Sequence, residues 1–212
     1  MALAGEDGGA MNGVCDPNER RDAAPRDPFL PFPILHTPRL RLRPIGPYDA
    51  DALHAILADE ETMRYYGGPP HRTRAETDAL IATIAARVTR RELLRWGLTR
   101  RDDDRLLGSC SLHAFDLGRH RAETGYALHR DAWGQGLMAE ALTAILGYAF
   151  GPLGLHRVEA IIDDANGRSK GLLLKLGFVY EGALRERYPL GDRFADEHYY
   201  GLLAHEWQAR RD

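Results

Sequence analysis

The sequence predicts a single α/β domain built on a mixed β-sheet. The hydrophobic patterns run in the order strand, two helices, three successive strands, strand–helix units and two final strands. With 212 residues, of which 44% are hydrophobic, the chain is long enough to bury one sizeable core. A glycine-bearing loop at 133–138 joins a strand pattern to an amphipathic helix pattern, and this order predicts one strand–loop–helix unit.

The N-terminal half of the domain begins with a strand at 40–44, where leucines alternate with arginines. A helix is predicted from Pro47 to about Asp59, followed by a Gly-Gly-Pro-Pro loop at 67–70. The second helix starts at Thr73, because Glu76 lies three residues later at capping-box spacing. We expect this helix to continue to about residue 90.

The C-terminal half contains the remaining elements. Strands are predicted at 94–99, 106–113, 123–128, 156–162, 178–184 and 194–203, and helices at 135–150 and 166–176. In the helix at 135–150, an apolar stripe at i, i+4, i+7 and i+11 is interpreted as core packing; its members are Met138, Leu142, Ile145 and Ala149. Gly151-Pro152 and Gly177 are expected to end the two helices.

Residues 1–33 are expected to form a disordered or variable N-terminal extension to a domain at 34–212, because residues 1–27 contain almost no large apolar side chains. Residues 1–35 hold six of the 31 acidic and three of the 28 basic residues, which leaves 25 of each in the remainder. The net charge of −3 therefore belongs to the extension. A balanced domain argues against direct nucleic-acid binding, which needs clustered Lys and Arg.

The two cysteines, Cys15 and Cys110, lie far apart and are interpreted as reduced thiols of a cytoplasmic protein. No apolar run approaches the length of a membrane span, and the N-terminus lacks the pattern of a secretion signal. The histidines show no metal-ligand spacing, so no metal site is expected.

Two features indicate a binding site for an elongated, phosphate-bearing molecule. The loop Trp133-Gly134-Gln135-Gly136-Leu137-Met138 can direct free backbone N–H groups at an anion from a helix N-terminus. Its simpler interpretation is a tight turn that needs two glycines. The loop is neither a Walker loop nor a Rossmann fingerprint. Asn166 places a side-chain amide at the start of the next helix, where it would also serve as an ordinary N-cap.

Several motifs together resemble the GNAT acyltransferase superfamily. They are Glu-Thr-Gly-Tyr-Ala-Leu at 123–128, Trp-Gly-Gln-Gly-Leu-Met-Ala-Glu-Ala at 133–141, His-Arg-Val-Glu-Ala at 156–160, Asn166-x-x-Ser169 and Lys-Leu-Gly-Phe at 175–178. The similarity covers about Thr37 to Trp207. Within the superfamily, the chain resembles the branch of ribosomal-protein N-terminal acetyltransferases (RimJ/RimL-like).

The resemblance implies the GNAT fold, with a mostly antiparallel central sheet of six to seven strands flanked by about four helices. It also implies acetyl-CoA as co-substrate, without a metal. Three sets of cofactor-binding residues are implied. Backbone groups would bind the pantetheine arm at Tyr126, Ala127 and Leu128. Backbone N–H groups would bind the pyrophosphate at Gly134, Gln135, Gly136, Leu137, Met138 and Ala139, and Asn166 would hydrogen-bond the pantetheine chain through its side chain.

The implied mechanism is direct attack of an amine on the thioester. Glu123 is the candidate base, although an exposed strand carboxylate paired with an arginine is the simpler interpretation. Many superfamily members are thought to protonate the leaving thiolate with a tyrosine, and the matching position here is Leu173. Ser169 is the replacement candidate, with water as its rival.

We therefore expect an N-acetyltransferase that acts on a primary amine, with a protein N-terminus favoured by the branch resemblance. The alternatives are acetylation of a small amine, such as a polyamine or an aminoglycoside, and a non-catalytic acyl-CoA-binding module, which Leu173 would support. The protein is expected to be a monomer or a homodimer.

Overall fold

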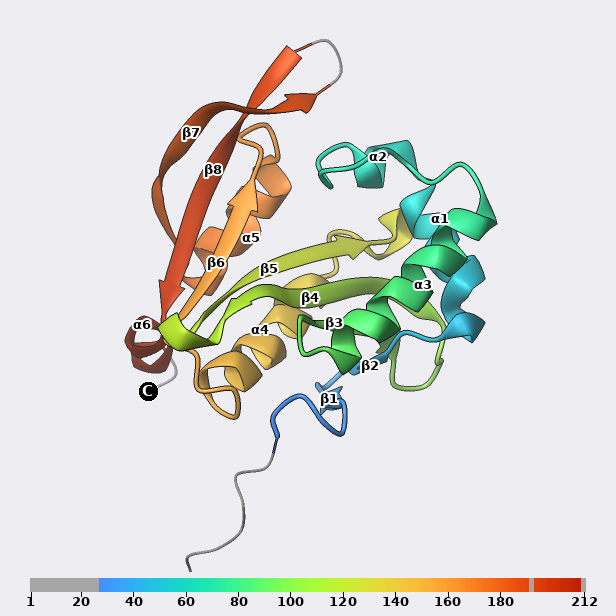
Figure 1. Cartoon of the computed structure of the whole chain (residues 1–212), viewed down its shortest axis with the longest axis horizontal. Coiled ribbons are helices and arrows are strands. Elements are labelled where there is room, and N and C mark those ends of the chain that lie inside the picture. The colour runs from blue at the N-terminus through green and yellow to red at the C-terminus, as the bar shows by residue number, and fades with distance from the viewer. Residues whose placement is uncertain (1–26, 191–192, 211–212) are drawn as a thin grey trace, which may run out of the picture.

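The protein, described by a computed structural model over residues 27–190 and 193–210, is built on one eight-stranded sheet with the order β1-β2-β3-β4-β5-β6-β8-β7 (Figure 1). The strands are β1 Leu35–His36, β2 Leu40–Pro44, β3 Leu93–Arg100, β4 Leu106–Asp116, β5 Arg121–Leu128, β6 Arg157–Ile162, β7 Val179–Leu190 and β8 Arg193–Leu203. Neighbouring strands are antiparallel except β5 and β6, which are parallel.

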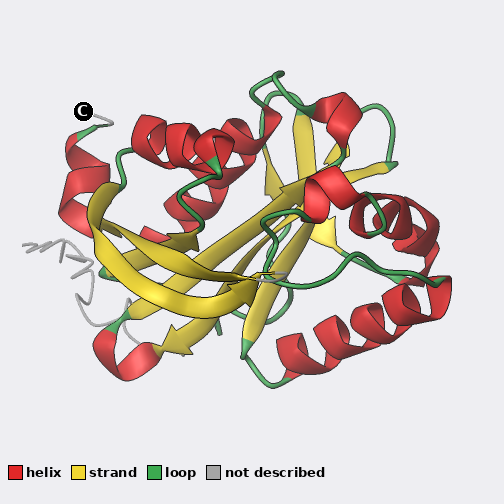
Figure 2. Ribbon diagram, turned by 90° about the horizontal axis from the view of Figure 1, so that it is seen from above, coloured by secondary structure: helices red, strands yellow, loops and turns green. Residues whose placement is uncertain are grey.

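Helices cover both faces of the sheet, as the view from above shows (Figure 2). The α-helices are α1 Ala50–Leu57, α2 Glu60–Met63, α3 Arg74–Thr89, α4 Leu137–Phe150, α5 Gly167–Leu176 and α6 Ala204–Ala209. One core lies between the sheet and α4 and includes Trp96, Leu112 and Leu142. The second lies between the sheet and the α1–α3 pair and includes Ile56, Ile84 and Leu93. The domain is therefore a three-layer sandwich of helices, sheet and helices.

Local sequence signals predicted the longer helices well. The capping box of α3 is present, with the Thr73 side chain accepting from the Glu76 backbone and the Glu76 side chain accepting from the Thr73 backbone. The predicted stripe of α4 is buried throughout, and Leu137, Ala141 and Leu146 widen it. Gly177 ends α5 in the left-handed conformation that favours glycine, with φ of 97°.

The predicted α/β fold is confirmed, with one more strand than the predicted maximum of seven. The additional strand, β1, has only two residues, too few to produce an alternating pattern. The short helices α2 and α6 were also missed, because four and six residues do not complete two turns.

The sheet opens between β5 and β6, and this opening positions the site. On one side, β5 pairs with β4 as far as Leu128. On the other side, it pairs with β6 only over 121–123, after which β6 continues along β8 alone. The second half of β5 therefore exposes one edge of its backbone, on the side where β6 turns away in Figure 1.

Part of the predicted N-terminal extension packs on the domain. Phe29 is buried and makes an edge-to-face contact with Phe115. The Tyr148 hydroxyl donates to the Pro28 carbonyl at 2.5 Å, and the Trp96 indole donates to the Pro33 carbonyl at 2.7 Å. Residues 1–26, including Cys15, lie outside the described residues, so the boundary at residue 33 stays a prediction.

Candidate active site

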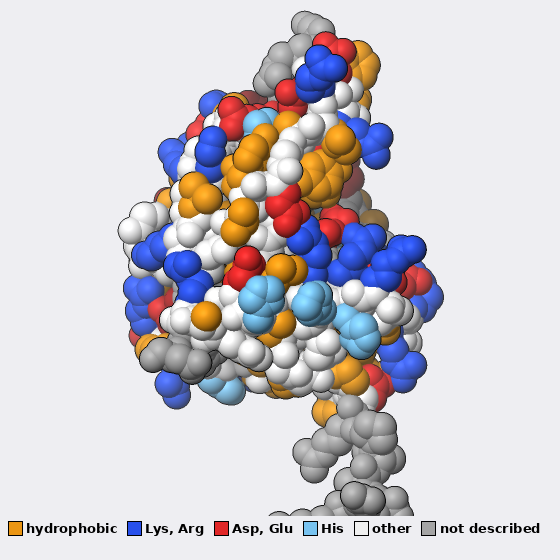
Figure 3. Space-filling view, turned by 90° about the vertical axis from the view of Figure 1, so that its left-hand side faces the viewer, with side chains coloured by type: hydrophobic (Ala, Val, Ile, Leu, Met, Phe, Trp, Pro, Cys, Tyr) orange, Lys and Arg blue, Asp and Glu red, His pale blue; other side chains and the backbone are white. Residues whose placement is uncertain are grey.

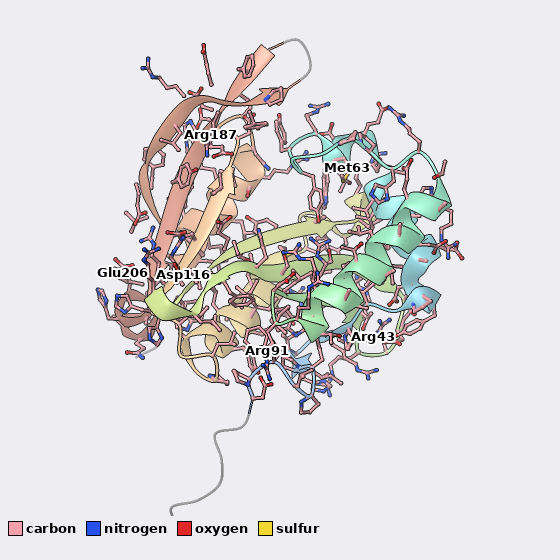
Figure 4. The ribbon with its side chains drawn as sticks, viewed as in Figure 1. Arg43, Met63, Arg91, Asp116, Arg187 and Glu206 are labelled. Atoms are coloured by element: carbon pink, nitrogen blue, oxygen red, sulfur yellow. The ribbon has the colours of Figure 1, made fainter. Side chains whose placement is uncertain are left out.

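A cavity of about 830 Å³ occupies the opening between β5 and β6. Its walls come from α2, the end of β5, the loop before α4, and α5. Ten of the predicted site residues line it: Tyr126, Ala127, Leu128, Gly134, Gly136, Leu137, Met138, Ala139, Asn166 and Ser169. Gln135 and Glu123 are not part of the lining. In Figure 4, Met63 of α2 and Arg187 of β7 lie on opposite sides of this opening.

The glycine loop ends in a helix N-terminus directed at the cavity. Gly134 and Gly136 both have φ of +72°, a conformation that glycine adopts without strain. Gly136 is the N-cap of α4, and the Glu140 amide makes the first bond inside the helix, to the Gly136 carbonyl at 3.1 Å. The N–H groups of Leu137, Met138 and Ala139 precede that bond and have no partner within the helix. The loop thus presents donors and the positive end of a helix dipole to the cavity.

Gln135 supports the loop from behind. Its carbonyl accepts from Arg39 at 2.9 Å, its side-chain oxygen accepts from Arg100 at 3.0 Å, and its side-chain nitrogen donates to the Asp131 carbonyl at 2.7 Å. All three partners lie outside the cavity lining. The alternation that the two glycines impose turns this side chain away, which the sequence motif alone did not indicate.

The start of α4 is fixed by Glu140. Its carboxylate accepts from the Thr37 hydroxyl at 2.6 Å and from the Arg39 backbone amide and guanidinium at 2.8 and 2.6 Å. Burial acts to raise the pKa of Glu140, but these hydrogen bonds outweigh it and hold the pKa below its ordinary value. A carboxylate in the first turn also complements the helix dipole.

Trp133 and Arg168 connect the two sides of the cavity. The Trp133 indole donates to the Leu128 carbonyl at 2.7 Å. The Arg168 guanidinium lies 4.3 Å from the centre of the Trp133 ring, and 3.7 Å from the Glu61 carboxylate on α2. The sequence analysis did not predict the role of Arg168, since the residues around it give no indication of a contact with the Trp133 ring, 35 positions earlier.

Two hydroxyl groups meet in the cavity wall. The Tyr126 and Ser169 oxygens are 2.6 Å apart. Burial raises the pKa of Tyr126, so its hydroxyl stays protonated at neutral pH. Asn166 caps α5 by accepting from the Ser169 amide at 3.1 Å, which confirms the N-cap interpretation. Leu173 is fully buried in the core and does not line the cavity.

The Tyr126 side chain is therefore a cavity residue that sequence reasoning assigned only through its backbone. Residues of β5 alternate between the two faces of the sheet, so Tyr126 points to the α5 side together with Ala122 and Thr124. That alternation was available in the sequence. What it could not supply was the position of Ser169, which depends on the packing of α5.

Glu123 lies on the opposite face of β5 from Tyr126 by the same alternation. Its carboxylate is 3.8 Å from the His113 imidazole, which is neutral at pH 7 because burial lowers the pKa of His113 to about 4. The nearby Arg121 contacts Glu159 at 2.7 Å instead of Glu123, so the structure shows no arginine paired with Glu123 among the described residues. Burial, followed by the negative charge of Glu159, raises the pKa of Glu123. A half-buried carboxylate with a raised pKa is a better proton acceptor than an ordinary glutamate.

Within the described ranges, no three His, Cys, Asp or Glu side chains are grouped so that they could hold a metal ion. Cys110 is a free thiol inside the core, where burial raises its pKa to about 12. None of the described helices is both long and apolar enough to span a membrane.

Comparisons with known proteins agree with this geometry. The family model described as "Acetyltransferase (GNAT) domain" matches residues 39–179. The uncharacterized N-acetyltransferase YoaA of Bacillus subtilis is 39% identical over 155 residues, which cover 73% of this chain and 88% of that protein. A GNAT-family acetyltransferase from Bacillus anthracis has a similar crystal structure, with a TM-score of 0.73, 25% identity, and coverage of 82% of this chain and 99% of that one.

More distant relatives carry named acceptors. The [ribosomal protein uS5]-alanine N-acetyltransferase of Escherichia coli is 30% identical over 55% of this chain and 60% of its own length. The spermidine N(1)-acetyltransferase of the same organism is 24% identical over 84% of this chain and 92% of its own length. The matched family model spans most of the domain. This chain therefore belongs to the GNAT acetyltransferase family and is an acyltransferase that uses acetyl-CoA as its co-substrate.

Proposed function

We propose that this protein transfers the acetyl group of acetyl-CoA directly to a primary amine, and that the amine is the N-terminus of a protein or peptide. The observation that carries the proposal is the cavity between β5 and β6, where an exposed strand edge, a helix N-terminus and a pair of hydroxyl groups converge. These three features match the three parts of the co-substrate: pantetheine arm, pyrophosphate and thioester.

The exposed edge of β5 suits the pantetheine arm, whose amides can pair with backbone groups as an added strand would. Tyr126, Ala127 and Leu128 supply these groups beyond the last β6 partner. The Leu128 carbonyl already accepts from Trp133, so the arm would use the remaining backbone groups. The Asn166 oxygen is occupied by capping, which leaves its amide nitrogen to donate toward the arm.

The pyrophosphate would lie against the N-terminus of α4. Leu137, Met138 and Ala139 offer backbone donors there, and the two glycines keep the approach clear of side chains. A Cβ atom added to Gly134 would meet no heavy atom within 4 Å, so the space in front of it is open. Arg168 and Lys175 add positive charge to the cavity wall.

The leaving thiolate would be stabilised by the Tyr126–Ser169 pair. A protonated Tyr126 on β5 can donate to the sulfur while Ser169 on α5 orients its hydroxyl. The pair would thus provide the proton donor that the Leu173 side chain lacks. The sequence analysis assigned this task to Ser169 alone. We now assign the donor to Tyr126 and the orienting role to Ser169.

The amine must lose its proton before it attacks. Glu123 would collect this proton through water, because it faces the other side of the sheet from Tyr126 and lies outside the cavity lining. Gly125, between these two residues in β5, carries no side chain, and a Cβ atom added there would lie 3.4 Å from the His113 ring. The raised pKa of Glu123 suits this task.

Acetylation of a small polyamine is the second candidate. The observation that favours it is a set of three carboxylates on β5, β6 and β8, namely Glu123, Glu159 and Glu197, in which the charges of the last two raise the pKa of the first. Figure 3, which shows the side of the molecule at the left of Figure 1, has acidic side chains mixed with Lys, Arg and His side chains on that face. Arginines already contact Glu159 and Glu197, which reduces the attraction for a polycation.

The experiment that tests the proposal is transfer of isotopically labelled acetyl-CoA to a panel of peptides with different N-termini and of polyamines. We expect label on peptide α-amines, detected by mass spectrometry, with unblocked peptides as substrates and N-terminally blocked peptides as controls. Label on polyamines alone would establish the second candidate. Binding of acetyl-CoA without transfer to any amine would contradict the proposed function.

A further inference from the structure

Arg95 of β3 is a guanidinium without a partner. It is partly buried, and its Nε atom is shielded from solvent with no hydrogen-bond partner. Among the described residues, its side chain has neither a hydrogen bond nor an ion pair. Leaving a charged donor buried and unpaired costs several times the free energy of an ordinary lost hydrogen bond. An unpaired guanidinium of this kind is available to bind an anionic group of another molecule.

The surroundings of Arg95 place it on the face of the sheet that carries Glu123. Arg95, Ser111 and Gly125 occupy one register row across β3, β4 and β5. His113 and Glu123 occupy the next row along the same strands. Alternate residues of a strand face the same side, so Arg95, Ser111 and His113 point to the Glu123 side of the sheet.

The neighbours of Arg95 are neutral or positive. Burial, followed by the positive charges of Arg95 and Arg87, lowers the pKa of His113 to about 4, so the imidazole is neutral at pH 7. Ser111 donates to the Gly125 carbonyl at 3.2 Å and lies 3.5 Å from the His113 ring. Arg87 has Glu92 at 3.8 Å, whereas Arg95 has no carboxylate among the described residues. The described part of the chain therefore supplies no counter-charge to Arg95.

We propose that Arg95 binds a carboxylate of the acceptor, so that the acceptor is an amine that also carries a carboxylate. This inference rests on the proposed function and narrows its acceptor class. The ammonium end of such an acceptor would lie toward Glu123 and its carboxylate toward Arg95. A free amino acid and a peptide with an acidic side chain near its N-terminus both present this pair of charges. A polyamine does not, and the positive charge of Arg95 opposes it.

The sheet sets the separation of the two charged groups. Neighbouring strands are about 4.8 Å apart, so the Cα atoms of Arg95 and Gly125 are separated by roughly 10 Å across β4. The long arginine side chain covers part of that distance. The carboxylate would therefore lie only a few bonds from the reacting amine, within the reach of an amino acid or of the first residues of a peptide.

The test is a titration calorimetry experiment on the full chain saturated with coenzyme A, which binds the site without allowing transfer. Two pairs of probes differ only in charge: L-alanine with L-alaninamide, and the C-terminally amidated peptides Asp-Ala-Ala-Ala with Asn-Ala-Ala-Ala. The first pair represents a free amino acid and the second a peptide N-terminus. Each probe is titrated into the wild type, Arg95→Met and Arg101→Met, the last being an exposed arginine in the turn after β3.

We expect at least one acid to bind the wild type about tenfold to one-hundredfold more tightly than its amide, as a charge-assisted hydrogen bond provides. The preference should persist in Arg101→Met and disappear in Arg95→Met. The pair that shows the preference identifies the source of the carboxylate. Arg95→Met should also melt at or above the wild-type temperature, because it removes an unpaired charge.

An acid preference that survives in Arg95→Met, or an equal affinity for acid and amide in both pairs, would overturn the inference. A clear loss of melting temperature in Arg95→Met would also count against it, since it would assign Arg95 a structural role. None of these readings depends on transfer. Failure to acetylate any amine would instead contradict the proposed function and leave the Arg95 result to be judged on binding alone.

Discussion

Two arginines of the same sheet differ completely in how their charge is satisfied. The Arg43 guanidinium, on β2, is 3% exposed and lies 2.8 Å from both oxygens of Asp49, which is equally buried. It also donates to the Asp104 carboxylate and backbone and to the Pro44 carbonyl, and it lies over the Tyr48 ring. Arg95, on β3, has no such contact within the described part of the chain. Figure 4 shows Arg43 near the lower edge of the domain, away from the opening above β5.

The difference separates residues that stabilise the fold from residues that serve the site. Hydrogen bonds with Asp49 and Asp104 raise the pKa of Arg43 despite its burial, so its charge is secured by the chain itself. Arg95 has no such partners within the described residues, and we assign its charge to binding of the acceptor carboxylate. The same contrast occurs for tyrosines and glycines, which makes it testable with matched substitutions.

Breaking the Arg43 network should have the largest effect. Asp49→Ala leaves a buried guanidinium without its main partner and removes the carboxylate that accepts from the Gly46 amide. We expect a loss of about 3–5 kcal/mol in the free energy of unfolding, measured by urea denaturation. Asp102→Ala, in the exposed turn after β3, is the control and should change stability by less than about 0.5 kcal/mol. Equal losses in the two variants would show that the ion pair does not stabilise the fold.

The tyrosine pair distinguishes a hydroxyl of the site from a hydroxyl of the scaffold. Tyr126→Phe should lower kcat by about 10²-fold, the lower range for a positioned proton donor, while the affinity for acetyl-CoA changes little. Tyr148→Phe removes a hydrogen bond to the Pro28 carbonyl and should reduce stability by about 1 kcal/mol without lowering kcat. Turnover measurements on both variants check this. A wild-type kcat in Tyr126→Phe would exclude its hydroxyl from thiolate stabilisation.

Two glycines share a left-handed backbone conformation but not a location. Gly134 has φ of +72° and lines the cavity, whereas Gly154 has φ of +61° in the loop after α4, and a Cβ atom added to either would meet no heavy atom within 4 Å. Alanine at either position should reduce the free energy of unfolding by about 1–2 kcal/mol. Only Gly134→Ala should also weaken acetyl-CoA binding, because its methyl group enters the space in front of the loop. Calorimetric titration of both variants with acetyl-CoA separates strain from obstruction, and equal affinities would remove Gly134 from the site.

The sequence predicted the parts of the molecule that depend on local pattern. The capping box at Thr73, the apolar stripe of α4 and the end of α5 at Gly177 each follow from residues a few positions apart. The residues that gather around the cavity also followed, because their motifs flank the strand–helix junctions. The sequence did not predict elements of only a few residues, such as β1, and it gave no indication of the direction of the Gln135 side chain.

The unpredicted features depend on contacts between distant segments. Tyr126 meets Ser169 only because α5 packs beside the open edge of β5, 43 positions away in the chain. Arg95 is recognisable as unpaired only when every neighbour is known, since the sequence offers acidic residues on both sides of it. Register and helix packing set these relations, and neither is encoded in a short window.

The smallest expected effect concerns pH and tests whether Glu123 is the base. Burial and the charge of Glu159 raise the pKa of Glu123, so the rate should fall with decreasing pH above the range of an ordinary glutamate. Glu159→Gln removes that charge and releases Arg121 from its contact at 2.7 Å, and both changes favour the ionised form of Glu123. The acidic limb of the kcat/KM profile should therefore move to lower pH. Glu206→Gln, on α6 away from the opening in Figure 4, is the control and should leave the limb in place. In Glu123→Gln, the acidic limb of the kcat/KM profile should disappear, and kcat/KM should be lower than in the wild type. If the limb keeps its position in Glu159→Gln and survives in Glu123→Gln, another group titrates and the amine loses its proton to solvent before it reaches the sheet.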